Sequence, residues 1–208
     1  NAAGYGLTFG LHTRIDGRVQ HVIDRVEAGN IYINRNQIGA VVGSQPFGGH
    51  GLSGTGPKAG GPRYLSAFLK GAGSPPDQPL TLPGPTGETN TYRQHPRAGV
   101  FCAGPGATAA REQAAAARAL GCARVIEAGD ARPEDVPHDV SAVLYWGEDA
   151  KRWQMALAAM YGPIRALILS PAETPSLLLE QTICVDTTAS GGNAALLAAS
   201  SEMDMAAE

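Results

Sequence analysis

The sequence has few cysteines, no long apolar run and no excess of either charge, and each absence excludes a class of protein. Its three cysteines in 208 residues show no Cys-x-x-Cys spacing, which argues against a disulfide framework and a structural zinc site. No apolar run approaches the roughly 18 residues that a membrane-spanning helix needs. The first ten residues lack the basic and apolar regions of a signal peptide. A net charge of −3, with Lys and Arg scattered, gives no indication of nucleic-acid binding.

Metal-ligating and nucleophilic residues are also sparse. The five histidines show no i, i+4 pairing and no carboxylate at metal-ligand spacing, so we expect structural or surface roles and no metal site. Cys102 and Cys184 lie in apolar runs typical of strands, and Cys122 follows the end of an expected helix. We expect all three to be small buried residues, because a nucleophilic thiol needs a cationic or helix N-terminal setting and none is visible.

Glycine, by contrast, is concentrated in residues 45–65. This stretch reads QPFGGHGLSGTGPKAGGPRYL and holds seven glycines in 21 positions. So much bare main chain indicates a close approach to a ligand or a partner subunit, or else a disordered linker. Lys58, within the stretch, could attract an anion, although a solvated loop lysine is the more ordinary expectation.

The residues before this stretch carry short periodic patterns. Residues 5–13 alternate apolar and polar positions, which predicts a half-buried strand. Asp16 is placed to cap a helix whose apolar residues recur at three-four spacing, and Gly29 suits its C-terminal left-handed position. Residues 30–34, NIYIN, predict a short strand.

Residues 71–97 differ in composition from what precedes and follows them. They hold six prolines and few aliphatic residues, which predicts a linker or an oligomerisation arm. Residues 81–92 within this segment could still form an edge strand with turns.

From residue 98 onward, apolar strands alternate with helices. The expected strands are 98–104, 123–129, 141–147, 164–170 and 182–186, the helices are 107–120 and 148–161, and a helical turn is expected at 176–181. This alternation predicts βαβ units with right-handed crossovers around a parallel sheet. The predicted fold class is therefore α/β, with a small Rossmann-like domain in the second half.

One turn of this domain has the spacing of a dinucleotide-binding motif. Gly104, Gly106 and Ala109 follow the G-x-G-x-x-A pattern, and Glu127 lies near where an acidic residue would hold a ribose. Main-chain N–H groups at such a helix start can hold a pyrophosphate. Pro105 removes one of them, however, and close packing alone favours small residues in such a turn.

A resemblance to a known family is carried by GYGLTFGLHTRID, AGNIYINR and GSQPFGGHGLSGTGPKAGGPRYL. These stretches resemble the C-terminal end of an aldehyde dehydrogenase, and more narrowly the glutamate-semialdehyde (pyrroline-5-carboxylate) dehydrogenase module of the bifunctional proline utilization A (PutA) family. LTLPGPTGETNTY and TICVDTTASGGNAALL are also similar to that family. The resemblance implies four parts: the end of the dehydrogenase catalytic domain (1–70), the arm (71–97), a Rossmann-like C-terminal domain (98–180), and a C-terminal motif and tail (181–208).

The resemblance also implies a reaction and site residues. The reaction is the NAD-dependent oxidation of L-glutamate γ-semialdehyde to glutamate in proline catabolism. Gly60 and Gly61 match the loop that grips the substrate carboxylate through main-chain N–H groups. Phe68 matches the aromatic residue that packs on the aliphatic part of the substrate. Phe47 matches the aromatic residue that lines the aldehyde tunnel, and Leu7 matches a residue close to the nicotinamide.

The catalytic Cys and Glu of that family have no counterpart in this sequence. Because the chain also opens without Met and in mid-pattern, we expect a segment of a longer polypeptide that is catalytically inactive alone. The resemblance implies that NAD is bound mainly by upstream residues and FAD only by an upstream proline dehydrogenase domain. It further implies a cytoplasmic homo-oligomer whose other partners are the rest of its own polypeptide and the semialdehyde substrate.

Two other interpretations stay open. Residues 98–208 could be a stand-alone dinucleotide-binding module. Alternatively, the second half of the chain with its tail could be a purely structural segment that mediates assembly. In the tail, Ile183 and Val185 alternate as a strand able to add to an exposed sheet edge. Gly191 and Gly192 would then allow a reversal and Leu196 and Leu197 would form an apolar plug, unless the tail completes the core of its own domain.

Overall fold

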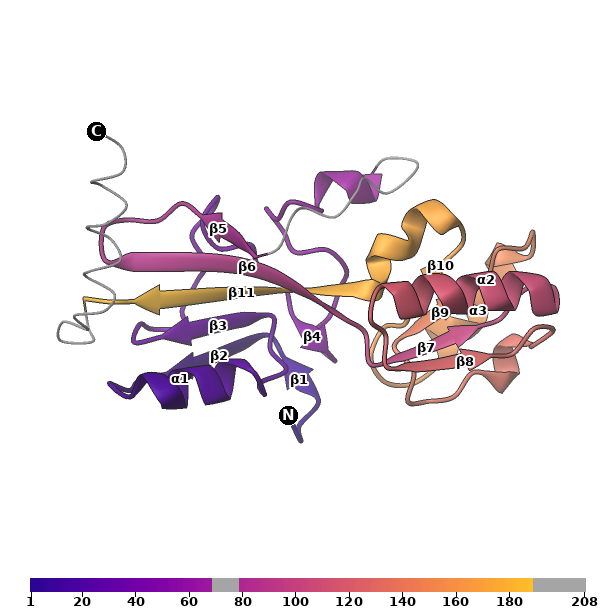
Figure 1. Ribbon diagram of the computed structural model, residues 1–208, viewed down its shortest axis with the longest axis horizontal. Coiled ribbons are helices and arrows are strands. Elements are labelled where there is room, and N and C mark those ends of the chain that lie inside the picture. The colour runs from indigo at the N-terminus through magenta and orange to yellow at the C-terminus, as the bar shows by residue number, and fades with distance from the viewer. Residues whose placement is uncertain (69–78, 189–208) are drawn as a thin grey trace.

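The computed structural model describes residues 1–68 and 79–188 and shows two lobes joined by a long pair of strands (Figure 1). The strands are β1 (Tyr5–Gly6), β2 (Thr8–Leu11), β3 (Asn30–Ile33), β4 (His50–Gly51), β5 (Leu80–Leu82), β6 (Glu88–Pro96), β7 (Gly99–Cys102), β8 (Arg124–Glu127), β9 (Ala142–Leu144), β10 (Ala166–Ile168) and β11 (Leu178–Asp186). The helices are α1 (Asp16–Ile23), α2 (Gly106–Ala119) and α3 (Ala150–Ala159), with short 3₁₀ helices η1 (Leu65–Phe68), η2 (Pro133–Asp135) and η3 (Pro171–Leu177).

The first lobe is built on a five-stranded sheet of order β2-β3-β11-β6-β5. β11 pairs in parallel with β3, with Ile183 opposite Ile31, and in antiparallel with β6 over its whole length. Helix α1 covers one face, where Ile23 packs with Ile31, Ile33 and Ile183. The last described strand therefore lies inside this sheet and not at its edge, and β1 and β4 form a separate two-stranded sheet beside it.

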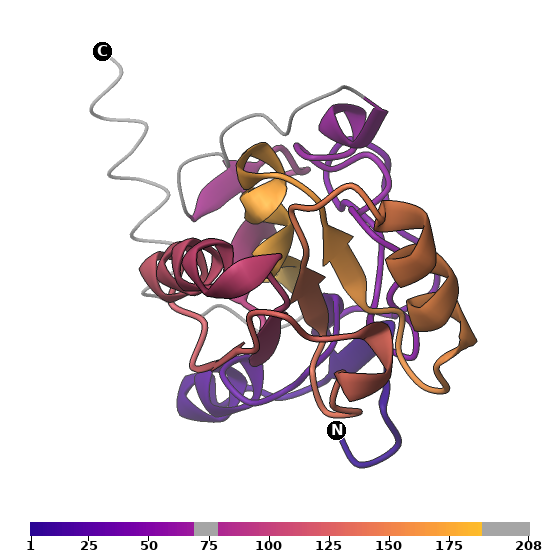
Figure 2. The ribbon, with the colours of Figure 1, turned by 90° about the vertical axis from the view of Figure 1, so that its right-hand side faces the viewer.

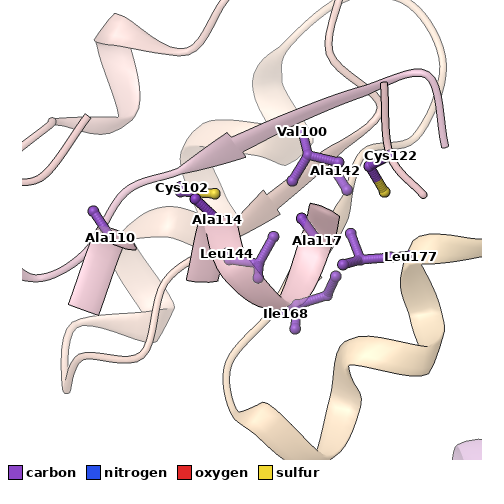
Figure 3. Packing of buried hydrophobic residues seen from close by; sticks show 10 residues of the cluster. All are labelled: Val100, Cys102, Ala110, Ala114, Ala117, Cys122, Ala142, Leu144, Ile168 and Leu177. Atoms are coloured by element: carbon purple, nitrogen blue, oxygen red, sulfur yellow. The ribbon is translucent and has the colours of Figure 1, made fainter. Parts of the chain in front are cut away.

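The second lobe is a four-stranded parallel sheet of order β10-β9-β7-β8. Figure 2 shows α2 and α3 on opposite sides of this sheet. The alanines of α2 pack on one face with Leu144 and Ile168 (Figure 3), and Trp153 and Leu157 of α3 pack on the other. Parallel strands with helices on both faces confirm the predicted α/β class and the Rossmann-like second half.

The strand predicted over residues 5–13 is confirmed in part: residues 8–11 form β2, whereas residues 5–6 form β1 in a separate sheet. Two predictions about α1 are wrong. Asp16 is the first helical residue, and the N-cap position belongs to Ile15. The helix ends at Ile23, so Gly29 has no C-capping role. A Cβ at Gly29 would lie 1.8 Å from the carbonyl oxygen of Gly48, so this glycine is required by close main-chain approach.

In the second half, the two predicted helices are confirmed to within about two residues at each end, whereas the helical turn predicted at 176–181 is wrong. The turn η3 ends at Leu177, and residues 178–181 open β11. A short apolar run such as LLLEQ does not distinguish helix from strand by periodicity. Pairing with β6 over nine residues decides the outcome.

The segment expected to be a linker holds two strands. Its residues 71–78 lie outside the described part of the chain, and β5 and β6 occupy 80–82 and 88–96. β5 is an edge strand, as the sequence allowed, while β6 lies inside the sheet. The division of the chain into four parts stays a prediction.

Candidate functional site

The glycine-rich loop, residues 45–63, lies on the polar face of the five-stranded sheet. Strand residues alternate between faces, so Asn30, Tyr92, Glu180 and Thr182 face away from α1. All four are buried, and the hydroxyl of Thr182 donates to the carbonyl of Pro46. The loop therefore covers a buried polar surface and is not a free linker.

Lys58 fixes this loop from the inside. Its side chain is 2% exposed, and its Nζ donates to Asn30 Oδ1 (2.7 Å), to the Gly48 carbonyl (2.7 Å) and to the Pro46 carbonyl (3.3 Å). Burial lowers the pKa of Lys58 to about 7, and Glu180 opposes that shift. The expectation of a solvated lysine, or of an ammonium group open to an anion, is therefore wrong.

Asn30 completes the clamp around Phe47. Its Nδ2 donates to the Pro46 carbonyl (2.9 Å), and its Oδ1 accepts the N–H of Gly48 (3.2 Å). The main chain of Phe47 is also paired in both directions with Ala59, at 3.0 and 2.8 Å. The residues on both sides of Phe47 are thus held, while its own side chain stays 36% exposed.

The loop then makes a tight turn at Lys58–Gly61. The N–H of Gly61 donates to the carbonyl of Lys58 (3.0 Å), and Gly60 has φ +70°, the left-handed value that a type II turn requires at this position. The main-chain N–H of Lys58 donates to Glu180 Oε2 (3.0 Å), and Glu180 Oε1 accepts the hydroxyl of Tyr92 (2.7 Å). A buried carboxylate on β11 therefore anchors the start of the turn.

The two glycines predicted as carboxylate ligands have different surroundings. Gly60 is exposed, a Cβ there would meet nothing within 4 Å, and its N–H has no partner among residues 1–68 and 79–188. The N–H of Gly61 is already engaged within the turn, and a Cβ there would lie 3.0 Å from the Lys58 carbonyl. In this geometry Gly60 supplies the open donor and Gly61 supports it.

Phe68 lies on η1, directly after the turn. The N–H of Tyr64 donates to the Gly61 carbonyl (3.0 Å), which ties the approach to η1 to the turn. Phe68 is 74% exposed and meets Tyr64 edge to face, with ring centroids 5.6 Å apart. The two rings together present an exposed apolar surface that follows Gly60 by a few residues in the chain.

Leu7 lies between β1 and β2, and its carbonyl accepts the N–H of Asn30 (3.1 Å). Its neighbour Gly6 leaves no room for a side chain, because a Cβ there would lie 2.0 Å from the Glu27 carbonyl. The side chain of Leu7 is 40% exposed. An apolar side chain such as that of Leu7 can contact a nicotinamide only through van der Waals contact with the ring. Asn30 links this position to the loop.

The cysteines have the character of buried core residues. Burial is the main cause that raises the pKa of Cys102 to about 12 and that of Cys184 to about 11, and it also raises the pKa of Cys122. Such thiols are poor nucleophiles at neutral pH. In the described residues no group of three or more His, Cys, Asp or Glu side chains is placed to hold a metal ion, and none of the helices there is long and apolar enough to cross a membrane.

The G-x-G-x-x-A turn of the second lobe uses its own donors. The N–H of Gly104 donates to Gln113 Oε1 (3.0 Å), and the N–H of Gly106 donates to the Gly129 carbonyl (3.0 Å). A Cβ at Gly104 would lie 2.0 Å from that same carbonyl. Glu127 forms an exposed ion pair with Arg118 (2.7 Å). Close packing therefore accounts for Gly104, whereas Gly106, where a Cβ would meet nothing within 4 Å, is explained by its φ of +77°.

Sequence reasoning missed three residues that build the site: Asn30, Glu180 and Tyr92. A polar residue beside or inside an apolar strand was the available signal, since Asn30 opens NIYI and Glu180 follows LLL. Buried polar side chains need partners, so such positions point to a network. The sequence did not predict that their partner is the glycine-rich loop, because the loop is separated from Asn30, Tyr92 and Glu180 by many residues in the chain.

Comparisons with known proteins agree on one family. Residues 1–71 match the family model described as "Aldehyde dehydrogenase family". The chain is 36% identical, over 95% of its length, to "Bifunctional protein PutA" of Rhizobium meliloti, of which it covers 22%. Over 34% of its length it is 48% identical to "1-pyrroline-5-carboxylate dehydrogenase" of Bacillus subtilis, of which it covers 14%. The chain thus spans about a fifth of the length of the curated PutA relatives that it matches.

A solved structure shares the fold. The PutA structure from Corynebacterium freiburgense matches with a TM-score of 0.64 at 24% identity, covering 89% of this chain and 23% of that one. This match supports both lobes of the fold.

Proposed function

We propose that this chain, which matches the aldehyde dehydrogenase family model over residues 1–71 and resembles the PutA proteins over 95% of its length, is the substrate-anchoring part of an L-glutamate γ-semialdehyde (pyrroline-5-carboxylate) dehydrogenase. The observation that carries the proposal is the turn Lys58–Gly61, in which the N–H of Gly60 has no partner among residues 1–68 and 79–188 and a Cβ at Gly60 would meet nothing within 4 Å. A main-chain donor at a left-handed glycine is suited to a carboxylate, because no Cβ obstructs the approach of the anion.

Each part of the turn has a proposed task in binding. The N–H of Gly60 donates to the substrate carboxylate, and Gly61 keeps the turn in shape through its bond to Lys58. Glu180 is held beside the turn by hydrogen bonds from Lys58 N–H and the Tyr92 hydroxyl, and the Lys58 side chain partly offsets its negative charge. Phe68 covers the aliphatic part of the substrate and excludes water from it, and Phe47 lines the tunnel that holds the aldehyde end.

The chemical step is proposed to use residues outside this chain. A Cys thiolate there attacks the aldehyde and a Glu assists the water that releases glutamate. NAD, when bound, accepts the hydride, and Leu7 is the residue of this chain proposed to contact its nicotinamide. FAD is proposed only for a proline dehydrogenase domain elsewhere in the polypeptide. We further propose that the second lobe acts as a lid and that the protein is a cytoplasmic homo-oligomer.

The test is a substrate comparison on the full-length protein. NADH formation is followed with L-glutamate γ-semialdehyde and with propanal, which has no carboxylate. We expect a kcat/KM at least tenfold higher for the semialdehyde, since a charge-assisted hydrogen bond contributes roughly 1.5–3 kcal/mol. Equal values for the two aldehydes would contradict a carboxylate anchor, and no NADH from either would contradict the dehydrogenase. The 208-residue chain alone should form no NADH.

A further inference from the structure

A pocket of about 180 Å³ lies at the junction of the two lobes. Its walls come from the glycine-rich loop, from β10, and from the segment where η3 passes into β11, which Figure 1 shows between the lobes. A water molecule in the liquid takes about 30 Å³, so the pocket has room for on the order of six waters or a small ligand.

Two arginines line this pocket without a carboxylate partner. Arg63 is 8% exposed and donates to the Leu178 carbonyl (2.9 Å) and to Ser176 Oγ (3.4 Å). Arg97 donates to the carbonyls of Ser176 (3.0 Å) and Ser141 (3.3 Å). Within residues 1–68 and 79–188, neither guanidinium forms an ion pair. Their charges are therefore satisfied by neutral acceptors alone.

The two charges act on each other. Burial, and next the neighbouring Arg63, lower the pKa of Arg97 to about 10. A lowered pKa at a guanidinium means that its positive charge is poorly compensated. An anion between the two groups would remove this penalty.

The other ionisable groups of the lining leave the pocket positive. Glu180 is the one acid among the lining residues, and its oxygens are engaged by Lys58 N–H and Tyr92. Lys58 also lines the pocket and adds a partial positive charge near pH 7. Burial lowers the pKa of His50 to about 4, so His50 is neutral there.

We propose that this junction pocket binds a small oxyanion with two negative charges, of the phosphate or dicarboxylate type, between the guanidinium groups of Arg63 and Arg97. A guanidinium presents a planar fork of donors that suits both kinds of oxyanion. The site is distinct from the open N–H of Gly60, and it does not depend on the proposed dehydrogenase activity. Because its walls come from both lobes, a bound anion would also hold the lobes together.

Arg165 provides a matched control. It is 6% exposed and, like Arg63 and Arg97, donates to main-chain carbonyls, those of His138 (2.8 Å) and Pro163 (3.3 Å). It does not line the pocket. Replacing Arg165 removes a buried arginine of the same structural kind without touching the proposed site.

The experiment is calorimetric titration of the full-length protein with inorganic phosphate, sulfate or glutarate at constant ionic strength. We expect saturable binding of at least one of these anions, and the one that binds identifies the oxyanion class. Arg63→Gln and Arg97→Gln should each weaken binding at least about tenfold, and Arg165→Gln should leave it unchanged. No saturable binding in the unaltered protein, or equal weakening by all three variants, would overturn the proposal.

A second measurement covers the case in which the pocket variants do not fold. Crystals of the unaltered protein are soaked in selenate, whose selenium gives an anomalous signal. A peak within hydrogen-bond distance of both Arg63 and Arg97 supports the site, and its absence overturns it. The aldehyde assay is run separately on the same protein, so failure of the anion site and failure of the proposed dehydrogenase activity are distinguished.

Discussion

The ammonium group of Lys58 lies 2.7 Å from the side-chain oxygen of Asn30, although 28 residues separate the two in the chain. This contact joins the glycine-rich loop to the first residue of β3. Asn30 in turn binds the main chain on both sides of Phe47. The position of the proposed substrate-binding loop thus depends on a buried pair of polar side chains, and this dependence can be tested.

Lys58→Met should loosen the loop, and the loss should depend on pH. The folded-state pKa of Lys58 is about 7, below its ordinary value of 10.5, so between these values the unfolded loop binds more protons. Loop stability in the unaltered protein should therefore rise as pH rises from 7 to 9. Between pH 7 and pH 9, the opening free energy of the loop should rise by about 2 kcal/mol more in the unaltered protein than in Lys58→Met.

Hydrogen exchange of residues 45–63 in the full-length protein, corrected for intrinsic rates, measures this opening free energy. Lys151→Met replaces an exposed lysine on α3 and serves as the control. If Lys58→Met and the unaltered protein show the same pH dependence, the amine is not buried in the way described.

Gly60→Ala should raise the KM for glutamate semialdehyde about tenfold and leave the KM for NAD unchanged. An alanine at φ +70° is strained by roughly 1–2 kcal/mol, so the turn would rotate its N–H away from the carboxylate. Gly39→Ala is the control, because Gly39 has φ +74° and equally open surroundings. Equal effects of the two variants would reject the anchor. Gly61→Val would also raise this KM, but less cleanly, since a Cβ there crowds the Lys58 carbonyl.

Phe68→Ala should lower kcat/KM for the semialdehyde by a factor of roughly ten, with a smaller effect on propanal. Covering an aromatic face contributes roughly 1–3 kcal/mol, and propanal has less aliphatic surface to cover. Leu65→Ala removes a side chain of similar exposure, 76%, from the same 3₁₀ helix. An equal loss for both aldehydes would show that Phe68 supports packing and does not recognise the substrate.

The second lobe should not hold a nicotinamide cofactor. The N–H groups of Gly104 and Gly106 are engaged by Gln113 and Gly129, and Pro105 has none. Gly106→Ala in the full-length protein should therefore leave both the affinity for NAD and the number of NAD molecules bound unchanged, as measured by equilibrium dialysis. Loss of one bound NAD in this variant would establish a second cofactor site.

Local patterns were enough to predict the second lobe from the sequence. Its strands are short apolar runs and its helices are long and alanine-rich, so neighbouring residues carry the signal. The turn at Gly60 was found through a family motif. The residues alone indicated only that the main chain there lacks side chains and could approach a ligand or a partner closely.

The first lobe depends on contacts between residues far apart in sequence, and these were missed. Glu180 accepts a hydrogen bond from the N–H of Lys58, 122 positions away, and Arg35 donates to Cys184 across 149 positions. Neither pair has a periodic signature. For the same reason the sequence predicted only that a strand around Ile183 and Val185 could add to a sheet edge. It did not predict that β11 pairs with β3 on one side and with β6 on the other.

The central position of β11 changes how the C-terminal tail must be tested. Ending the chain after Gln181 would remove residues 182–186 from between β3 and β6. The hydrogen-bonding groups of β3 and of residues 88–92 of β6 that face β11 would then lack partners. We expect that truncation to disrupt the five-stranded sheet. A loss of activity in this variant would result from unfolding, so the variant cannot test whether the C-terminal tail acts as a lid.

Ending the chain after Thr188 keeps β11 whole and removes only residues 189–208, which lie outside the described part of the chain and include the glycines and leucines of the expected plug. If the tail helps to close a cavity between two active sites, this variant should oxidise added semialdehyde at the normal rate. Its NADH formation from proline should begin only after a lag, because the intermediate would escape into solution before it is oxidised. The lag is measured in the full-length protein with and without residues 189–208, and circular dichroism checks that the shortened protein is folded. A folded variant that forms NADH from proline without a lag would exclude the lid role and leave the tail a part of its own lobe.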